Sequence, residues 1–312
     1  MSGRHDRAHH HAHAGGLTAT GRHRRRLALV VAITGTVFVG QVIGGLLSGS
    51  LALLADAGHM LADSAGLVLA LVASTLAARP ATKRRTFGLQ RAEVLAALTN
   101  ALVLVVIATS VLIGGIQRLQ ASPEVHGELM LGVATVGLAA NLAGLAILHR
   151  GRNESLNLRG AYLEVLGDLL GSVAVIVAGV VITLTGFMAA DAIAAFAIFV
   201  LIVPRAWSLL RDVVEVLLEA TPAGIDLDDV RAHLLGVPGV VDVHDLHAWT
   251  ITSGSPVLSA HVAVDADCLA DGRTGAVLDE LSACLDDHFD LSHCTLQLEP
   301  QGHRDHERPV HA

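Results

Sequence analysis

An apolar stretch about one fifth of the way along the sequence contains ionisable side chains. The stretch 53–66 contains His59 and Asp63, four residues apart, and Asp56 lies three residues before the histidine. On a helix, residues three, four and seven apart lie on the same face. These three side chains are therefore expected to point in one direction from one apolar helix.

A second pair of ionisable residues occurs further along, in the apolar stretch 162–172. Glu164 and Asp168 are again four residues apart. Charge within a membrane is costly, so such residues usually face a protein interior or a polar pathway and mark function. One imidazole and three carboxylates from two helices would supply the convergent N and O donors that a divalent metal needs. The sequence therefore predicts one transport site with four ligands: His59, Asp63, Glu164 and Asp168.

Two other interpretations of these residues stay open. A single pair could form a structural salt bridge or a metal-free proton relay, but both pairs fall at a matched depth in their segments, which favours a shared ion. Asp56 lies two turns before Asp63, nearer the predicted outer surface. We expect it to line the access path or to support a ligand rather than to bind the ion directly.

The composition is that of a membrane protein. Of the 312 residues, 52% are hydrophobic and only 16% are charged, and the mean hydropathy is +0.57. Ordinary soluble domains are more polar than this. Basic residues are concentrated in the first half and acidic residues after Glu215, which indicates a basic membrane-proximal half and an acidic aqueous domain.

Six apolar segments are long enough to cross a bilayer as helices. They span about residues 27–47, 51–78, 93–117, 128–149, 159–185 and 188–210. If the N-terminus is cytoplasmic, the connections on the cytoplasmic side hold fourteen Lys and Arg residues, Arg205 among them, and those on the other side hold only Arg118. Because basic residues favour the cytoplasmic side, we expect a multi-pass protein of the cell inner (plasma) membrane with both termini in the cytoplasm.

The sequence after the last apolar segment predicts a small α+β domain. Helices are expected at 227–235 and 273–289, and β-branched strands at 240–251, 257–264 and 294–298. This order, αββαβ, is typical of two layers with the helices on one face of the sheet. The predicted domains are a His/Arg-rich tail (1–26), a six-helix transport domain (27–211), the αββαβ domain (212–300) and a disordered tail (301–312).

Histidines and cysteines add candidate ligands in this last domain. His244, His247 and His261 fall on the two adjacent predicted strands. They are either metal ligands or ordinary exposed or hydrogen-bonded histidines, and the residues alone do not decide between the two. The chain has three cysteines without CxxC spacing, which favours reduced cytosolic thiols over a disulfide framework.

Several of these segments together resemble the cation diffusion facilitator family, most closely its bacterial zinc, cadmium and cobalt branch. The segments are LLADAGHMLAD, RPATKRRTFGLQRAEVLAAL, YLEVLGDLLGSVAVIVAG and HDLHAWTITSG. The resemblance implies a six-helix membrane domain, a cytosolic ferredoxin-like domain, a homodimer, and export of divalent metal in exchange for protons. It also implies regulatory metal in the cytosolic domain, where His244 and His261 match the family's ligand positions best.

The chain departs from the family at one predicted ligand. The zinc-transporting members carry HxxxD on both the second and the fifth helix, whereas here Glu164 replaces the second histidine. A carboxylate is a harder donor than imidazole and adds negative charge, which broadens the choice among zinc, cadmium, cobalt, manganese and iron. Three clustered carboxylates also repel one another, so the site is expected to take up protons when metal leaves it.

The function predicted from the sequence is a proton-coupled antiporter that exports divalent metal, zinc first, without enzymatic activity or a prosthetic group. An exporter that prefers iron or manganese is the alternative that Glu164 raises. An intramembrane metallohydrolase would need a motif such as HExxH, which the sequence lacks. An organic-cation exporter would need an aromatic-lined cavity, but aromatic residues make up only 3% of the chain. No nucleic-acid partner is expected.

Overall fold

The structure is a computed structural model, and it describes the backbone of residues 16–121, 123–149, 156–252, 254–291 and 293–306. The chain divides into two compact units. The first unit consists of Met1–Ser64 and Val103–Arg205, and the second of Ala65–Leu102 and Ala206–Ala312. Each unit thus combines two separate parts of the sequence.

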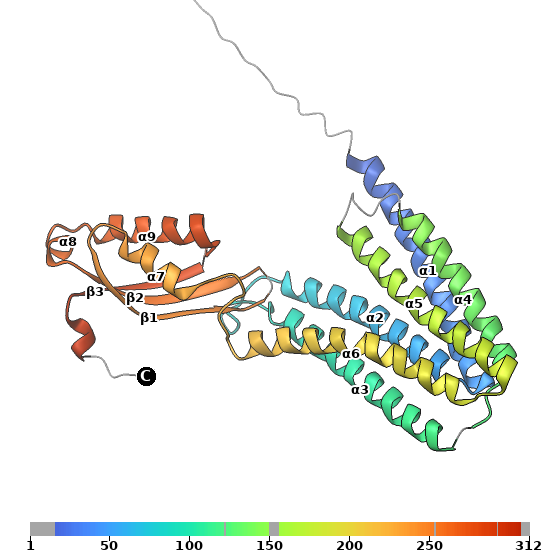
Figure 1. Cartoon of the computed structure of the whole chain (residues 1–312). Coiled ribbons are helices and arrows are strands. Elements are labelled where there is room, and N and C mark those ends of the chain that lie inside the picture. Colours follow the sequence, from blue (N-terminus) through green and yellow to red (C-terminus); the bar gives the residue numbers. More distant parts are fainter. Residues whose placement is uncertain (1–15, 122, 150–155, 253, 292, 307–312) are drawn as a thin grey trace, which may run out of the picture. The chain divides into compact units, whose positions relative to one another are not determined.

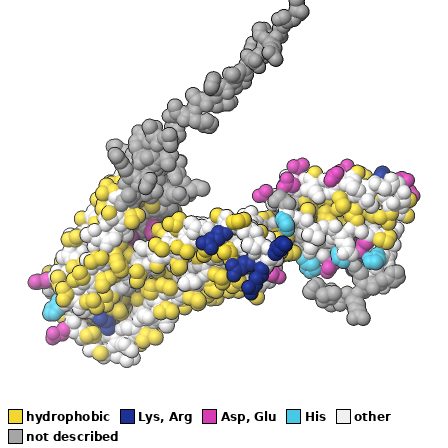
Figure 2. All heavy atoms as spheres, turned by 180° about the vertical axis from the view of Figure 1, so that it is seen from behind, with side chains coloured by type: hydrophobic (Ala, Val, Ile, Leu, Met, Phe, Trp, Pro, Cys, Tyr) yellow, Lys and Arg dark blue, Asp and Glu magenta, His cyan; other side chains and the backbone are white. Residues whose placement is uncertain are grey.

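Six long apolar helices make up most of the described chain. They are α1 (Gly16–Ser48), α2 (Leu51–Ala77), α3 (Ala92–Ala121), α4 (Gly127–His149), α5 (Leu156–Thr185) and α6 (Ala189–Leu217). Within the described residues these six, and no others, are long and apolar enough to cross a membrane, which confirms the predicted spans. Helix α6 continues to Leu217, beyond the predicted end at residue 210. Hydrophobic side chains cover the outer surface of the helices (Figure 2), as lipid contact requires.

In the first unit, α4 packs along both α1 and α5, and the three helices lie side by side (Figure 1). Small residues allow this close approach. A Cβ atom placed on Gly44 of α1 would lie only 2.5 Å from a methyl group of Val133 on α4. Membrane helices associate through such close contacts because lipid provides no hydrophobic force between them.

A buried carboxylate holds the beginning of α2. Asp191, in the first turn of α6, accepts hydrogen bonds from Ser50 Oγ at 2.6 Å and from the backbone N–H groups of Leu51 and Ala52 at 2.8 and 3.1 Å. Arg118 of α3 donates to the same carboxylate at 2.9 Å. The first N–H groups of a helix have no partner within it and favour negative charge. Asp191 therefore caps α2 from a different helix.

The second unit contains the C-terminal domain. Its elements are α7 (Leu227–Leu235), β1 (Val240–Thr250), β2 (Pro256–Val264), α8 (Ala266–Ala270), α9 (Thr274–Phe289), β3 (His293–Pro300) and the 3-10 helix η1 (His303–His306). The described sheet has the order β1-β2-β3, with β1 and β2 antiparallel and β2 and β3 parallel. The predicted αββαβ order is confirmed. The short helices α8 and η1 are additional, and η1 lies in the segment that the sequence predicts to be a disordered tail.

The core of the C-terminal domain lies on one face of the sheet, between the strands and the helices. Val243, Leu258 and Val262 are fully buried and pack with Leu281 and Leu285 of α9. Successive side chains in a strand point to opposite faces, so residues at the intervening positions of β2 point away from the helices. His261 is one of these residues, and it therefore lies on the helix-free face of the sheet.

Candidate functional site

His59 and Asp63, the predicted pair on α2, lie next to each other on one face of the helix, as their spacing of four residues requires. His59 Nε2 lies 3.6 Å from Asp63 Oδ2, and the two side chains are 14% and 3% exposed. Both residues belong to the first unit, within an otherwise apolar helix. The carboxylate and the imidazole therefore share one face, directed into protein rather than towards lipid.

The predicted pair on α5 lies in the same unit. Asp168 is buried and Glu164 is half-buried. Asp63 is close enough to interact electrostatically with both of them. The structure thus places the carboxylates of α2 and α5 in one neighbourhood, and their role as ligands of one ion stays a prediction.

Arg205 of α6 contacts Asp63, and this contact was not predicted from the sequence. Its guanidinium donates to Asp63 Oδ2 at 2.8 Å, and its side chain is 52% exposed. Sequence reasoning counted Arg205 only as a basic residue at the cytoplasmic boundary. The available signal was its position directly after Pro204, within the last apolar run of α6. A positively charged neighbour of the candidate site therefore comes from a third helix.

Several donor atoms at this place are buried without a hydrogen bond. Among the described residues, His59 Nδ1, Asp63 Oδ1 and Asp168 Oδ1 have no hydrogen-bond partner. Leaving buried polar atoms unpaired is costly, and such atoms call for an explanation, one of which is an ion. The donor set of imidazole nitrogen and carboxylate oxygen suits divalent transition metals. No three candidate donors of this membrane site lie within 4.8 Å of one another in the described structure.

Asp56 belongs to a neighbouring buried polar contact. Its Oδ2 accepts a hydrogen bond of 2.7 Å from Gln41 Nε2 of α1, and both side chains are 1% exposed. Gly171 of α5 approaches the same carboxylate so closely that a Cβ there would collide with Asp56 Oδ1. Asp56 therefore links α1, α2 and α5, and its predicted role on the access path stays a prediction.

The C-terminal domain contains a tighter cluster. His244 of β1, His261 of β2 and Glu299 of β3 each offer a ligand atom within 4.8 Å of the others, the only such group of three in the described chain. His244 Nε2 lies 3.0 Å from Glu299 Oε1, and His261 Nδ1 lies 3.5 Å from Glu299 Oε2. Sequence analysis proposed the two histidines and missed Glu299. The strand that carries Glu299 alternates exposed and half-buried positions up to Leu298, and Glu299 is buried against this alternation. No local motif marks it.

The geometry of the sheet explains this convergence. His244 and His261 are directly opposed across the β1–β2 pair, and their ring centroids are 5.3 Å apart. A bulge follows, since the register shifts between His244 and His247 and Asp245 adopts a φ of 48°. A bulge re-aims the side chains beside it. His247, the third candidate on these strands, instead contacts Asp245 through Nε2 at 3.0 Å.

Six membrane-length helices with inward-facing ionisable residues, followed by a small α/β domain, define a multi-pass membrane protein. Comparison with known families gives the finer class. Residues 27–218 match the family described as "Cation efflux transmembrane domain". Residues 222–301 match the family described as "Cation efflux protein, cytoplasmic domain". The chain belongs to the cation efflux family, and the resemblance seen in its motifs is confirmed.

Individual relatives are similar over almost the whole chain. The metal cation efflux system protein CzcD of Cupriavidus metallidurans is 43% identical over 93% of this chain and 89% of its own length. The zinc transporter ZitB of Escherichia coli is 40% identical over 94% and 93%. A protein of Bacillus subtilis named cadmium, cobalt and zinc/H(+)-K(+) antiporter is 38% identical over 88% of each chain.

Proposed function

We propose that this protein exports divalent metal cations, zinc first and cadmium and cobalt with it, in exchange for protons. The observation that carries the proposal is a set of buried donor atoms without a hydrogen bond in the first unit: His59 Nδ1, Asp63 Oδ1 and Asp168 Oδ1. Three relatives support it by their names, which specify metal efflux, zinc transport and antiport.

Each residue of the membrane site has a role in this proposal. His59 and Asp63 supply a nitrogen and an oxygen donor from α2, and Glu164 and Asp168 supply oxygen donors from α5. Because these atoms are further apart than the ligands of one ion, α2 and α5 approach each other when the metal binds. Arg205 and the metal compete for Asp63 Oδ2, since both are cations. The metal is the transported substrate at this site, not a resident cofactor.

Proton coupling follows from the charge of the same cluster. Three carboxylates cannot all stay ionised side by side in a low-dielectric interior without a compensating cation. Protons replace the metal when it leaves, and an arriving metal displaces them. Each transport cycle thus exchanges metal for protons through one set of oxygen atoms.

Location and assembly are part of the same proposal. The excess of basic residues on one side of the membrane favours both termini in the cytoplasm, with the protein in the inner (plasma) membrane. The domain organisation is that inferred from the sequence: a tail to residue 26, a transport domain to 211 and the αββαβ domain to 300. The C-terminal domain joins two chains in a homodimer and binds regulatory metal through His244, His261 and Glu299.

Glu164 favours a second candidate cargo. A site with three carboxylates is harder than one with two imidazoles, and hard ligands suit manganese and iron(II) better than they suit zinc. An exporter of iron or manganese is therefore the alternative. It differs from the first proposal in the cargo and not in the mechanism.

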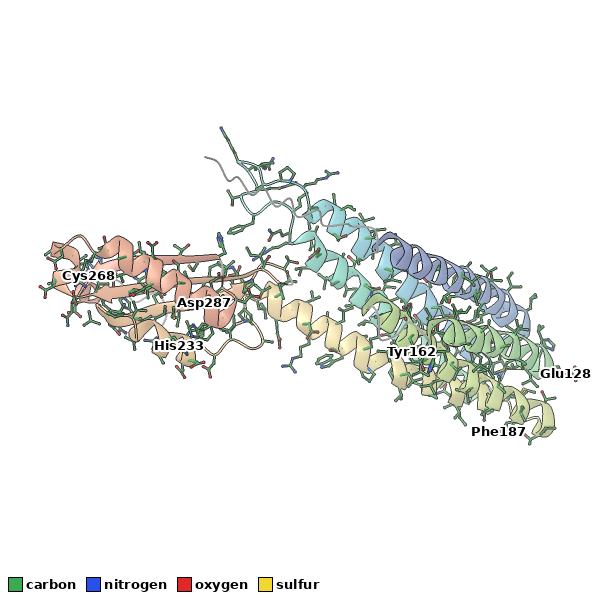
Figure 3. The ribbon with its side chains drawn as sticks, turned by 90° about the horizontal axis from the view of Figure 1, so that it is seen from above. Glu128, Tyr162, Phe187, His233, Cys268 and Asp287 are labelled. Atoms are coloured by element: carbon green, nitrogen blue, oxygen red, sulfur yellow. The ribbon has the colours of Figure 1, made fainter. Side chains whose placement is uncertain are left out.

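Transport by the purified protein in proteoliposomes tests the proposal directly. A pH indicator inside the vesicles reports protons, and an indicator of divalent metal reports cargo, for a panel of zinc, cadmium, cobalt, manganese and iron(II). We expect zinc flux with opposite proton flux, and loss of both in the Asp168→Ala variant. Glu128→Ala is the matched control because Glu128 is an exposed acidic residue in the first turn of α4 (Figure 3). Metal flux that is indifferent to the pH gradient, with the membrane potential clamped, would contradict antiport.

A further inference from the structure

The helical layer of the C-terminal domain brings two histidines together. Helices α7 and α9 lie next to each other (Figure 1), and Figure 3 labels His233 on α7 and Asp287 on α9. The ring centroids of His233 and His288 are 4.9 Å apart. Cys284 precedes His288 by four residues on α9, so both lie on one face of that helix. Two neighbouring helices therefore carry three side chains that commonly bind metals. Their ligand atoms do not all lie within 4.8 Å of one another, so side chains have to turn towards an ion for all three to bind it.

The hydrogen bonds of the two imidazoles determine which nitrogen is available. His233 Nδ1 lies 2.9 Å from the backbone carbonyl of Asp229, and His288 Nδ1 lies 3.0 Å from the carbonyl of Cys284. A carbonyl oxygen can only accept, so in each ring Nδ1 carries the hydrogen. In the neutral ring the lone pair is then on Nε2. Nε2 of neither ring makes a hydrogen bond to a described residue.

This arrangement matches the way proteins prepare histidine ligands. A metal-binding imidazole usually donates its other N–H to a backbone carbonyl or a carboxylate, which fixes the ring and its tautomer. His233 Nδ1 has both kinds of acceptor nearby: the backbone carbonyl of Asp229 and, at 3.5 Å, the carboxylate Oδ1 of the same residue. Phe289 packs edge-on against the His233 ring, at a centroid distance of 5.1 Å. The His233 ring is thus oriented before any ligand arrives.

Cys284 supplies a sulfur donor at the same place. It is a free, half-buried cysteine, and it lines a surface hollow together with His233, Asp229 and Glu280. Burial raises the pKa of the Cys284 thiol, and the neighbouring Asp287 carboxylate raises it further. The thiol is therefore protonated at neutral pH, and a metal that binds its sulfur must release this proton to solvent.

We propose that His233, Cys284 and His288 form a metal site on the helical face of the C-terminal domain. One sulfur and two imidazole nitrogens select soft or borderline cations, namely zinc, cadmium or copper(I). On binding, the S–H proton leaves and a sulfur–metal bond forms, without any change of oxidation state. The site is separate from His244, His261 and Glu299 because the sheet lies between the two sets. Occupancy ties α7 to α9, so the helical layer itself responds to cytoplasmic metal.

Sulfur ligation gives this site a spectroscopic signature of its own. The full-length protein in detergent is titrated with cadmium, and the thiolate-to-metal charge-transfer absorption is recorded. We expect the band in the wild type and its loss in Cys284→Ser. Cys294→Ser is the matched control because Cys294 is also a free, half-buried cysteine of the same domain, and this variant keeps the band. The double variant His244→Ala/His261→Ala keeps it too.

The two histidines are tested by affinity and by pH. His233→Ala and His288→Ala are each expected to weaken the band-forming site by roughly tenfold or more, since even residues that only orient ligands contribute 10- to 100-fold. Because cadmium displaces the thiol proton, the apparent affinity of the wild type should fall as the pH is lowered from 8 to 6.

Three results would overturn the proposal: no band in the wild type, a band that persists in Cys284→Ser, or unchanged cadmium affinity in both histidine variants. Thermal unfolding of each variant without metal identifies any that fails to fold, and in that case Cys284→Ala and His288→Gln replace it. All these readouts are binding measurements. They stay informative even if the protein transports nothing, so this proposal and the proposed function fail separately.

Discussion

The candidate metal clusters in the membrane and in the C-terminal sheet use the same donor types in different geometries. His244, His261 and Glu299 lie within 4.8 Å of one another on three strands of one sheet, and the backbone ladder fixes their spacing. In the membrane cluster the donors come from α2 and α5, they are further apart, and Arg205 of α6 contacts one of them. The ligand atoms of the sheet cluster are close enough to share one ion as they stand, whereas those of the membrane cluster would have to move closer together to do so.

This difference fits the roles proposed for the two clusters, regulation for the sheet cluster and transport for the membrane cluster. A regulatory site gains affinity when its ligands are held in place before binding, because less ordering is required on binding. A transport site must release its cargo on the far side, and donors carried on separate helices allow both a closed and an open arrangement. Substitutions in the two clusters test this contrast, from the largest expected effect to the smallest.

Removing a carboxylate from the membrane cluster should abolish export. Asp63→Ala and Asp168→Ala each delete an oxygen donor in a buried place where no other group replaces it. We expect zinc flux in proteoliposomes to fall by roughly 100-fold, the upper end of the losses seen for residues that support metal ligands. Membrane insertion and dimerisation should be unchanged, as checked by size-exclusion chromatography.

Near-normal flux in either variant would remove that residue from the transport path. Glu128→Ala again serves as the control, since it removes an acidic group of the same unit from an exposed position. Its flux should equal that of the wild type.

Changing the sheet cluster should affect metal binding but not the transport step itself. Glu299→Gln keeps the size of a side chain that is 3% exposed and removes its charge. Measured in an Asp168→Ala/Cys284→Ser background, which silences the membrane site and the site proposed on the helical face, metal affinity by competition with a chelator should fall roughly 10- to 100-fold. In a wild-type background, zinc flux at saturating metal should persist. Equal affinities with Gln and Glu at this position would exclude Glu299 as a ligand.

Exchanging the unusual ligand on α5 should alter selectivity. Glu164→His restores a nitrogen donor and removes one negative charge, so the ratio of zinc to manganese flux should rise by roughly threefold to tenfold. The ratio is measured at matched protein level and pH, because histidine itself titrates near neutrality. An identical ratio in the two proteins would mean that Glu164 does not touch the metal.

Neutralising the competing cation should have the smallest effect. Arg205→Gln removes the charge that contacts Asp63 Oδ2, so metal should bind more tightly. The Arg205 side chain is half exposed, and exposed ion pairs are weak and screened by salt. We therefore expect a gain of roughly twofold to fivefold in apparent affinity at low ionic strength, and a smaller one at high salt. Arg205→Lys, which keeps the charge, should behave like the wild type, and weaker binding in Arg205→Gln would reverse the assigned role.

Local patterns were enough to predict most of the elements. The helix 227–235 and the two strands of the hairpin were predicted to within a residue or two, since apolar periodicity and glycine punctuation are local signals. The parallel pairing of β3 with β2 was not predicted. It joins segments separated by α8 and α9, and no local pattern specifies such a partner.

The same limit applies to the two site neighbours that sequence analysis missed. The His59/Asp63 and Glu164/Asp168 pairs are visible because charge is rare in apolar helices. Glu299 lies in a strand of a polar domain, where a carboxylate is ordinary, and only strand register brings it to His244. Arg205 has a side chain long enough to reach either the membrane boundary or a neighbouring helix, so its position alone does not say which.

The cap that Asp191 places on α2 fixes one end of this helix, so that the helix could tilt about that end. The fixed point is at Leu51, where the first N–H groups of α2 donate hydrogen bonds to Asp191 of α6, and Arg118 donates to the same carboxylate. At a rise of 1.5 Å per residue, Asp63 lies about 18 Å along the helix axis from Leu51, and His59 lies about 12 Å from it. A tilt of about 10° would therefore move Asp63 by about 3 Å and His59 by about 2 Å. A rigid tilt about this fixed end would therefore change the distance between the donors of α2 and those of α5 by a few ångströms without unwinding either helix.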